Sequence, residues 1–136
     1  MKEKIFETLN AMGFNLTEVD TFGYAFKYEG VNFLYMYNED DEKFLNLSIP
    51  CIHDLDKEDV IKYYALCDKI NSTLKYVKAY TLNDSLWLFY ERELFENDDL
   101  EELLSRMIHQ LTMALLVVRN TIQKMEEEET TDDNNQ

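Results

Sequence analysis

Side chains that could carry acid–base or metal chemistry are few in this chain of 136 residues. It has two histidines, His53 and His109, and two cysteines, Cys51 and Cys67. Cys51 and His53 could supply two ligands to one metal ion, but neither Cys67 nor His109 has the local spacing that usually completes a zinc site. We therefore expect no metal site, two buried reduced thiols, and histidines that make only local hydrogen bonds.

The carboxylates also give no sign of a catalytic centre. Residues 38–42 read NEDDE, which lacks the alternating ligands and central glycine of a calcium-binding EF-hand loop. The other acids cluster in loops and at the starts of predicted helices, where capping and solubility account for them. With 3 glycines, the chain has no phosphate-binding loop and no nucleophile elbow. We expect no catalytic residue, no cofactor and no enzyme activity.

The charge of the chain restricts its partners. The formal net charge is −15, and six of the acids lie in the segment 126–133. Such a charge repels nucleic acid and anionic membranes, and it favours basic or neutral protein segments. The N-terminal residues 1–10 carry charges that a signal peptide would lack, and no segment has the roughly 20 apolar residues of a membrane span. We expect a cytoplasmic protein with a protein partner, no nucleic acid and no membrane.

Hydrophobic periodicity predicts one α+β domain over residues 1–125, followed by a disordered acidic tail over 126–136. Helical spacing predicts three helices, which begin at Lys2, at an N-cap on Asp56, and at an N-cap on Asn97 or Asp98. Alternating spacing predicts strands over 22–28, 31–37, 45–49, 76–81 and 85–95. The predicted order is helix-strand-strand-strand-helix-strand-strand-helix, with an antiparallel sheet and the helices on one face.

This element order, together with the length and acidity, resembles the YbjN family and the related fold of the type III secretion chaperones. The resemblance covers residues 1 to about 125. It implies a small, acidic bacterial homodimer that holds a partner polypeptide. No family motif matches residue by residue, so the resemblance implies no particular site residues.

Both predicted hairpins sort their side chains into an aromatic face and an aliphatic face. Two-residue turns at Glu29-Gly30 and Asn83-Asp84 define which side chains lie opposite one another. A loop of four residues, 39–42, would then place Phe44, Asn46 and Ser48 on the aromatic face. We expect the helices to cover the aliphatic face and the aromatic face to be exposed for partner binding. The candidate partner-binding residues are Tyr24, Phe26, Phe33, Tyr35, Tyr37, Tyr80, Trp87 and Phe89. In the alternative, the aromatic residues form the core and the sheet faces the other way.

The third predicted helix has more apolar surface than one sheet face needs. Met113, Leu116 and Val117 lie off its main apolar stripe, and we expect them to form a homodimer interface. In the alternative, this stretch packs under the loops that follow the first helix and the third strand.

These features together predict a non-catalytic protein-binding module of the chaperone or adaptor kind. It would hold a partner polypeptide on the aromatic sheet face or in a dimer groove. The alternative is an inhibitor or immunity protein that uses its negative charge to block a basic enzyme.

Overall fold

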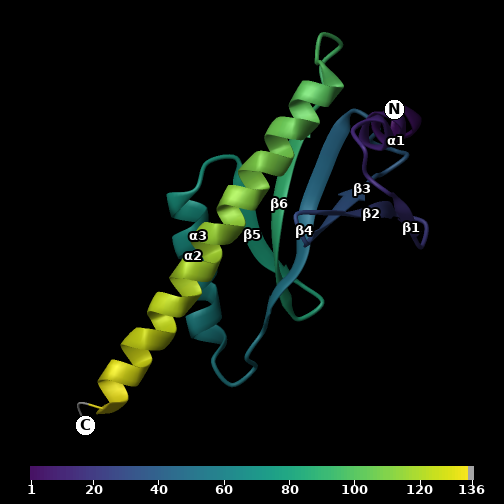
Figure 1. Cartoon of the computed structure of the whole chain (residues 1–136). Helices are drawn as coiled ribbons and strands as arrows, with labels where there is room; N and C mark the ends of the chain where they lie inside the picture. The colour runs from purple at the N-terminus through teal and green to yellow at the C-terminus, as the bar shows by residue number, and fades with distance from the viewer. Residues whose placement is uncertain (135–136) are drawn as a thin grey trace.

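The computed structural model of the chain describes residues 1–134, which form three helices and one six-stranded antiparallel sheet (Figure 1). The strand order is β1-β2-β3-β4-β6-β5. The predicted class and element order are confirmed, with the short strand β1 as an addition. The elements are α1 (Lys2–Ala11), β1 (Thr17–Val19), β2 (Gly23–Tyr28), β3 (Val31–Met36), β4 (Phe44–Asp54), α2 (Val60–Thr73), β5 (Val77–Leu82), β6 (Ser85–Glu93) and α3 (Leu100–Asn134).

Helix α1 ends where the sequence predicts. Gly13 adopts a φ of +98°, a backbone conformation that residues other than glycine rarely adopt. Its N–H bonds the carbonyl of Asn10, and the N–H of Phe14 bonds the carbonyl of Leu9, so the last carbonyls of the helix are satisfied. The chain then turns back to form β1 at the sheet edge.

Both predicted two-residue turns are present, and both hairpins have the predicted register. Glu29 and Gly30 have positive φ angles, and so do Asn83 and Asp84, as expected for tight hairpin turns that match the twist of the strands. Tyr28 lies opposite Val31 in the first hairpin.

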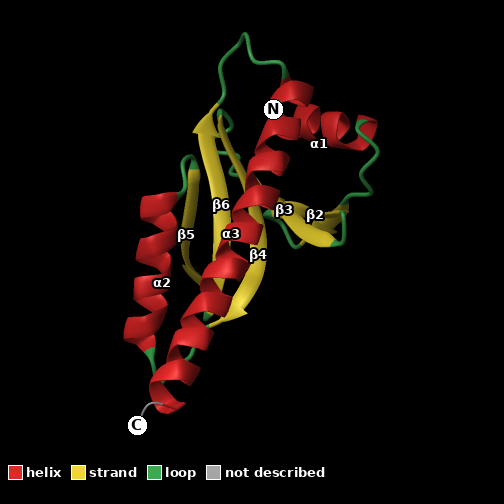
Figure 2. Cartoon of the chain, turned by 60° about the vertical axis from the view of Figure 1, so that its left-hand side comes forward, coloured by secondary structure: helices red, strands yellow, loops and turns green. Residues whose placement is uncertain are grey.

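Strand β4 joins the two hairpins, but the first hairpin soon leaves it. The pairing of β3 with β4 covers only three residue pairs and ends at Leu34 opposite Ser48. Beyond that point β4 contains Pro50 and then Cys51 at φ +52°, and its register with β6 shifts between Ile49 and His53. The β2–β3 hairpin therefore crosses β4 at a steep angle (Figure 2).

The three helices cover one face of the sheet (Figure 2). Leu104, Met107 and Leu111 of α3 are fully buried against the sheet, and α1 contributes Ile5 and Leu9 to the same core. The helix starts differ slightly from those predicted. The carboxylate of Asp59, rather than that of Asp56, accepts the capping bond of α2 from the N–H of Lys62. The carboxylate of Asp99 accepts the corresponding bond of α3 from the N–H of Glu102.

The segment predicted as a disordered tail is helical as far as the structure describes it. Helix α3 continues to Asn134, and residues 135 and 136 lie outside the described part. The prediction is therefore wrong for residues 126–134. The helix forms here because glutamate has good helix propensity. It is also held by an ion pair between the carboxylate of Glu129 and the ammonium of Lys62 on α2, at 2.7 Å, which composition alone cannot reveal.

The prediction of an exposed aromatic face is wrong for the first hairpin. Tyr35 pairs with Leu47, so the aromatic side chains of β2 and β3 share a face with Leu45, Leu47 and Ile49 of β4. The predicted loop of residues 39–42 placed Phe44, Asn46 and Ser48 on that face. This placement requires a register between β3 and β4 that differs by one residue from the observed register. Since a shift of one residue reverses every side chain of a strand, this error turned the first hairpin over.

Candidate functional site

The face of the sheet opposite the helices carries its own small apolar layer. Its buried members are Leu34, Trp87 and Phe89, which come from β3 and β6. Half-buried side chains surround them: Val19, Ala25, Met36 and Leu82. We call this surface the open face. No helix of the described residues contributes to its apolar layer.

Three rings lie nearly parallel on the open face. The centroids of Tyr80 and Phe89 are 4.2 Å apart with an interplanar angle of 8°, and those of Phe89 and Trp87 are 5.7 Å apart at 10°. Tyr80 is 41% exposed, whereas Trp87 is 8% exposed. Tyr80 is therefore accessible to solvent, while Phe89 and Trp87 beside it are packed in the apolar layer. Such an arrangement suits an aromatic contact surface.

A polar group lies next to these rings. The carboxylate of Glu91 accepts a hydrogen bond from the side-chain amide of Asn46 at 2.9 Å and pairs with the ammonium of Lys78 at 2.9 Å. The hydrogen bond to Glu91 raises the pKa of Lys78. Burial, followed by the charge of Glu91, raises the pKa of Tyr80. Tyr80 therefore stays neutral and Lys78 positive at physiological pH.

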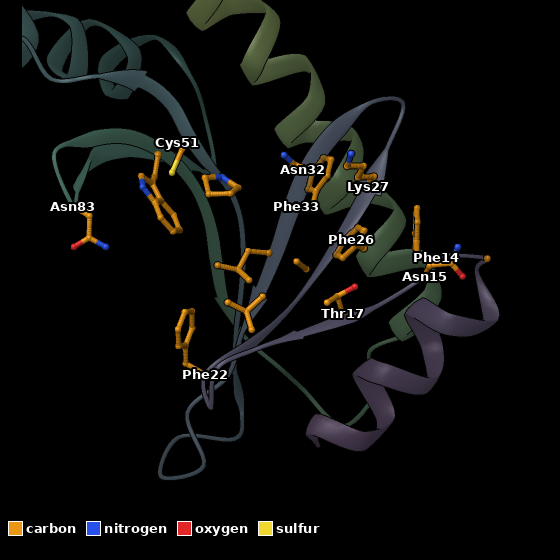
Figure 3. A pocket seen from close by; sticks show the side chains of 16 residues that line it. Phe14, Asn15, Thr17, Phe22, Phe26, Lys27, Asn32, Phe33, Cys51 and Asn83 are labelled. Atoms are coloured by element: carbon orange, nitrogen blue, oxygen red, sulfur yellow. The ribbon is translucent and has the colours of Figure 1, made fainter.

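A groove of about 730 Å³ lies on the open face (Figure 3). It lies where the β2–β3 hairpin leaves β4. Figure 3 shows Cys51 and Asn83 on one side of the hollow, Phe26 and Phe33 on the other, and Phe22 at one end. We call this cavity the groove. Its lining is Gly13, Phe14, Asn15, Thr17, Val19, Phe22, Ala25, Phe26, Lys27, Asn32, Phe33, Leu34, Pro50, Cys51, Asn83 and Trp87.

The groove has an unusual charge composition for this chain. Lys27 is its only charged lining residue, and no aspartate or glutamate lines it, although the chain has 28 acids in 136 residues. Volume and lining fall in the usual range for a binding pocket, which is mostly apolar with a few polar groups. The groove therefore favours an uncharged apolar occupant.

Trp87 lines the groove, and its indole N–H is a buried donor without an acceptor among the described residues. Leaving such a donor unpaired costs roughly 1–3 kcal/mol. The side-chain oxygen of Asn46 is likewise buried and unpaired. A buried, unpaired group of this kind is usually bonded to ordered water or takes part in a functional site.

Comparison with solved structures places this architecture among known folds. The chain is similar to the crystal structure of YbjN from E. coli, with a TM-score of 0.63, 14% identity, and coverage of 89% of this chain and 93% of the other. It is also similar to an uncharacterised protein from Methanothermobacter thermautotrophicus, with a TM-score of 0.64, 17% identity, and coverage of 91% and 97%. The chain has a YbjN-like fold. No family model matches it, and no curated protein sequence does.

The YbjN-like fold separates the eight predicted partner-binding residues. Three of them, Tyr80, Trp87 and Phe89, lie on the open face, but Trp87 and Phe89 are buried there, so only Tyr80 has the exposed ring that was predicted. The other five lie on the helix-covered face. Of these, Phe26, Phe33 and Tyr35 are buried in the core, and Tyr24 and Tyr37 are half-buried against it. Phe26 and Phe33 also reach the wall of the groove, because the sheet is split beside them.

Sequence reasoning missed the open-face residues of the first hairpin. Ala25, Leu34 and Met36 belong to the open face, although their small aliphatic side chains suggested helix packing. No local signal marks them, because their placement depends on the loop at residues 38–43. Asn38 accepts hydrogen bonds there from the N–H groups of Asp40 and Asp41, so two successive turns lengthen the connection.

The predicted interface residues of α3 lie on its outer side, away from the sheet. Met113 and Leu116 are each 49% exposed, and Val117 is half-buried. Their exposure leaves them available for a partner.

The residues considered for metal or acid–base chemistry do not converge within the described chain. No group of three or more His, Cys, Asp or Glu side chains in this part could hold a metal ion. The His53 ring stacks on Tyr63, whose hydroxyl donates to the carbonyl of His53 at 3.0 Å. Cys51 is exposed, so the prediction that both thiols are buried is wrong for this residue. None of the described helices has the length and apolar character needed to cross a membrane.

Proposed function

We propose that this YbjN-like domain is a non-catalytic binding module that holds a partner polypeptide on its open face, in the manner of a chaperone or adaptor. The observation that carries the proposal is the groove of about 730 Å³, together with the uncovered layer of Leu34, Trp87 and Phe89. A free sheet face with a hollow and a strip of rings is a common form of protein-binding surface.

The charge distribution supports a protein partner. The chain has a net charge of −15 although no acid lines the groove, so its overall charge can attract a basic chain and speed the encounter while apolar contacts in the groove hold it. The E. coli neighbour is described as a candidate transcription regulator. With a net charge of −15, this chain would reach such a role through a protein partner rather than through DNA.

We also propose that the module acts in the cytoplasm as a homodimer. The half-exposed Met113 and Leu116 support this, since two such side chains on one helix face are suited to an isologous interface. This interface lies on the helical side of the sheet, so the proposed dimer leaves the open face available.

Site-specific photo-cross-linking tests the partner-binding proposal. A photoreactive phenylalanine analogue replaces Tyr80 on the open face or, as the matched control, Ile61, which is 85% exposed on α2. The proposal predicts protein adducts from position 80 and few from position 61. Equal adducts from both positions, or adducts only from position 61, would contradict it.

The same adducts separate a chaperone or adaptor from an inhibitor. A chaperone or adaptor should cross-link to a flexible segment that proteases cleave readily once it is released. An inhibitor or immunity protein should cross-link to a folded enzyme whose activity falls when the domain is added. A folded enzyme partner would move the proposal to the inhibitor class.

A further inference from the structure

Strand β3 has a free edge inside the sheet, beside the groove. Backbone groups of successive strand residues point alternately to the two neighbouring strands. The hydroxyl of Ser48 on β4 donates to the carbonyl of Leu34, so the backbone of Leu34 points toward β4. The backbone of Asn32, two residues earlier, must point the same way. However, the pairing of β3 with β4 ends at Leu34.

Strand β4 is unable to pair with β3 at Asn32. Opposite Asn32 it has Pro50, which has no N–H, and Cys51, whose positive φ breaks the extended conformation. Both residues line the far side of the groove, across from Asn32. The N–H and C=O of Asn32 therefore face an open gap rather than a neighbouring strand.

The outer edge formed by β5 is less suited to pairing. On β5, the side chain of Asn71 accepts from the N–H of Ala79 at 2.7 Å and donates to its carbonyl at 2.9 Å. This contact occupies the outward backbone groups in the middle of that edge, a known protection against unwanted pairing.

We propose that an uncharged, apolar segment of the partner polypeptide adds as a strand to the free edge of β3 at Asn32, with alternate side chains entering the groove. This inference rests on the proposed function and specifies its partner. Addition of a strand takes its affinity from backbone hydrogen bonds and its specificity from pockets for alternate side chains. The acid-free lining selects against charged side chains at the inward positions, because a charge buried there would have no counter-ion except Lys27.

Trp87 provides a direct readout, since it is the only tryptophan of the chain and lines the groove. A segment in the groove would exclude water from the 8% of Trp87 that is still exposed and shift its fluorescence to shorter wavelength. A carbonyl of the segment would also provide an acceptor for the unpaired indole N–H if the ring turns toward the groove.

Synthetic peptides serve as probes for a fluorescence titration. The first is an uncharged peptide of about eight residues in which valine and threonine alternate, a composition with high strand propensity. The second has the same sequence with alternate backbone nitrogens methylated, so that it cannot donate along one edge. The third carries lysine at the valine positions, whose side chains would enter the groove, where no carboxylate lines the wall to pair with it. The proposal predicts that the first peptide binds and that the other two bind at least tenfold more weakly.

Two substitutions at one position separate the backbone contribution from the side chain. Asn32→Pro removes the N–H that faces the gap. It removes no backbone hydrogen bond to β2, because Lys27 and Asn32 lie opposite each other as a non-hydrogen-bonded pair. Asn32→Ala changes the side chain and keeps the N–H. Asn32→Pro should weaken peptide binding at least tenfold, and Asn32→Ala less than about threefold. Circular dichroism and thermal unfolding of both variants check that the fold is kept.

Several results would overturn the proposal. These are an absence of any Trp87 response to the first peptide at millimolar concentration, equal binding of the methylated peptide, and equal binding to the folded Asn32→Pro variant. Equal binding of the methylated peptide would indicate a site for a small apolar ligand instead. The cross-linking from position 80 remains informative in each case: adducts there with no peptide binding would reject strand addition and keep the proposed function.

Discussion

At the scale of single residues, aromatic side chains with similar sequence surroundings have different roles. Tyr35 and Tyr80 both alternate with aliphatic neighbours on a strand of a hairpin. Tyr35 is 4% exposed and belongs to the core under the helices, whereas Tyr80 is 41% exposed on the open face. Their substitution therefore distinguishes a structural ring from a surface ring.

We predict that Tyr35→Ala destabilises the domain by about 3–5 kcal/mol, the usual cost of removing a ring from a packed core. Tyr80→Ala should cost about 1 kcal/mol, since it removes a stacking contact with Phe89 at a half-exposed site. Urea unfolding of the two variants measures both values. A large loss for Tyr80→Ala with a small loss for Tyr35→Ala would mean that the two faces are interchanged.

The buried tyrosines also predict a dependence of stability on alkaline pH. Burial raises the pKa of Tyr35 from 10.0 to about 12, and burial also raises the pKa of Tyr63. A raised pKa means that the folded state holds the phenol proton more tightly. The stabilisation is complete below pH 10, and it is lost as the pH rises toward 12.

We therefore predict that Tyr35 accounts for a loss of about 1 kcal/mol in the free energy of unfolding between pH 9 and pH 11. Tyr35→Phe keeps the ring in the core and removes the ionisable group, so it should lower the slope of stability against pH in this range. Tyr64→Phe, at a ring that is 60% exposed on α2, is the matched control. Identical slopes for wild type and Tyr35→Phe would show that Tyr35 is accessible to solvent.

At the scale of elements, local sequence signals predicted the register of each hairpin correctly, but the predicted register between β3 and β4 is wrong. The turn residues Glu29-Gly30 and Asn83-Asp84 determine the register over a few residues, and both registers are as predicted. The connection from β3 to β4 has no such signal. Its length decides whether Leu47 or Ser48 lies beside Tyr35, and the turns within it are apparent only once the backbone is seen.

The burial of the first hairpin could therefore not be read from its own alternation. Both of its faces are apolar enough to be core, with rings on one side and Ala25, Leu34 and Met36 on the other. The second hairpin was assigned correctly, because Lys78 and Glu91 mark its open face. A charged pair identifies a solvent face, whereas tyrosines do not, since they are common on both sides of a sheet.

The long helix α3 predicts a graded response to truncation. Removal of residues 126–136 takes away the ion pair between Glu129 and Lys62, which is partly exposed, and should cost less than about 1 kcal/mol. Removal of residues 122–136 also takes Ile122 and Met125, which pack against the core, and should cost about 2 kcal/mol more. Thermal unfolding measures both. Equal melting temperatures for the two truncated chains would show that this part of α3 is not docked.

The outer side of α3 predicts self-association. Leu116→Glu combined with Val117→Lys should convert a dimer to a monomer, because it places charges in the proposed apolar interface. Ser105→Glu, at an exposed site nearer the start of the helix, is the control and should leave the dimer intact. Sedimentation at micromolar concentration reports the mass, and circular dichroism checks the helix. A wild-type chain that stays monomeric at high concentration would reject the dimer.

At the scale of the whole molecule, the sheet has one face covered by the helices and one open face to which we assign partner binding in our proposal. The helices cover the first with a continuous core, and the second carries the groove, the three rings and a free strand edge. Composition indicated an acidic, single α+β domain. It could not reveal the groove, because that cavity comes from the angle at which the β2–β3 hairpin leaves β4.

Cys51 allows the most direct test of the central claim that partners bind on the open face. It is exposed and lines the groove, and burial raises the pKa of the other thiol, Cys67, which lowers its reactivity. In a Cys67→Ser background, a bulky maleimide on Cys51 would fill the groove. The control carries Cys51→Ser and Cys67→Ser together with Tyr64→Cys, which places the same label on the exposed side of α2.

The measurement is the amount of partner protein retained by each labelled chain, compared with its unlabelled form at equal folded concentration. Our account predicts that the label at Cys51 reduces retention at least tenfold and that the label at position 64 leaves it nearly unchanged. Full retention by the chain labelled at Cys51, or a loss confined to the chain labelled at position 64, would contradict it.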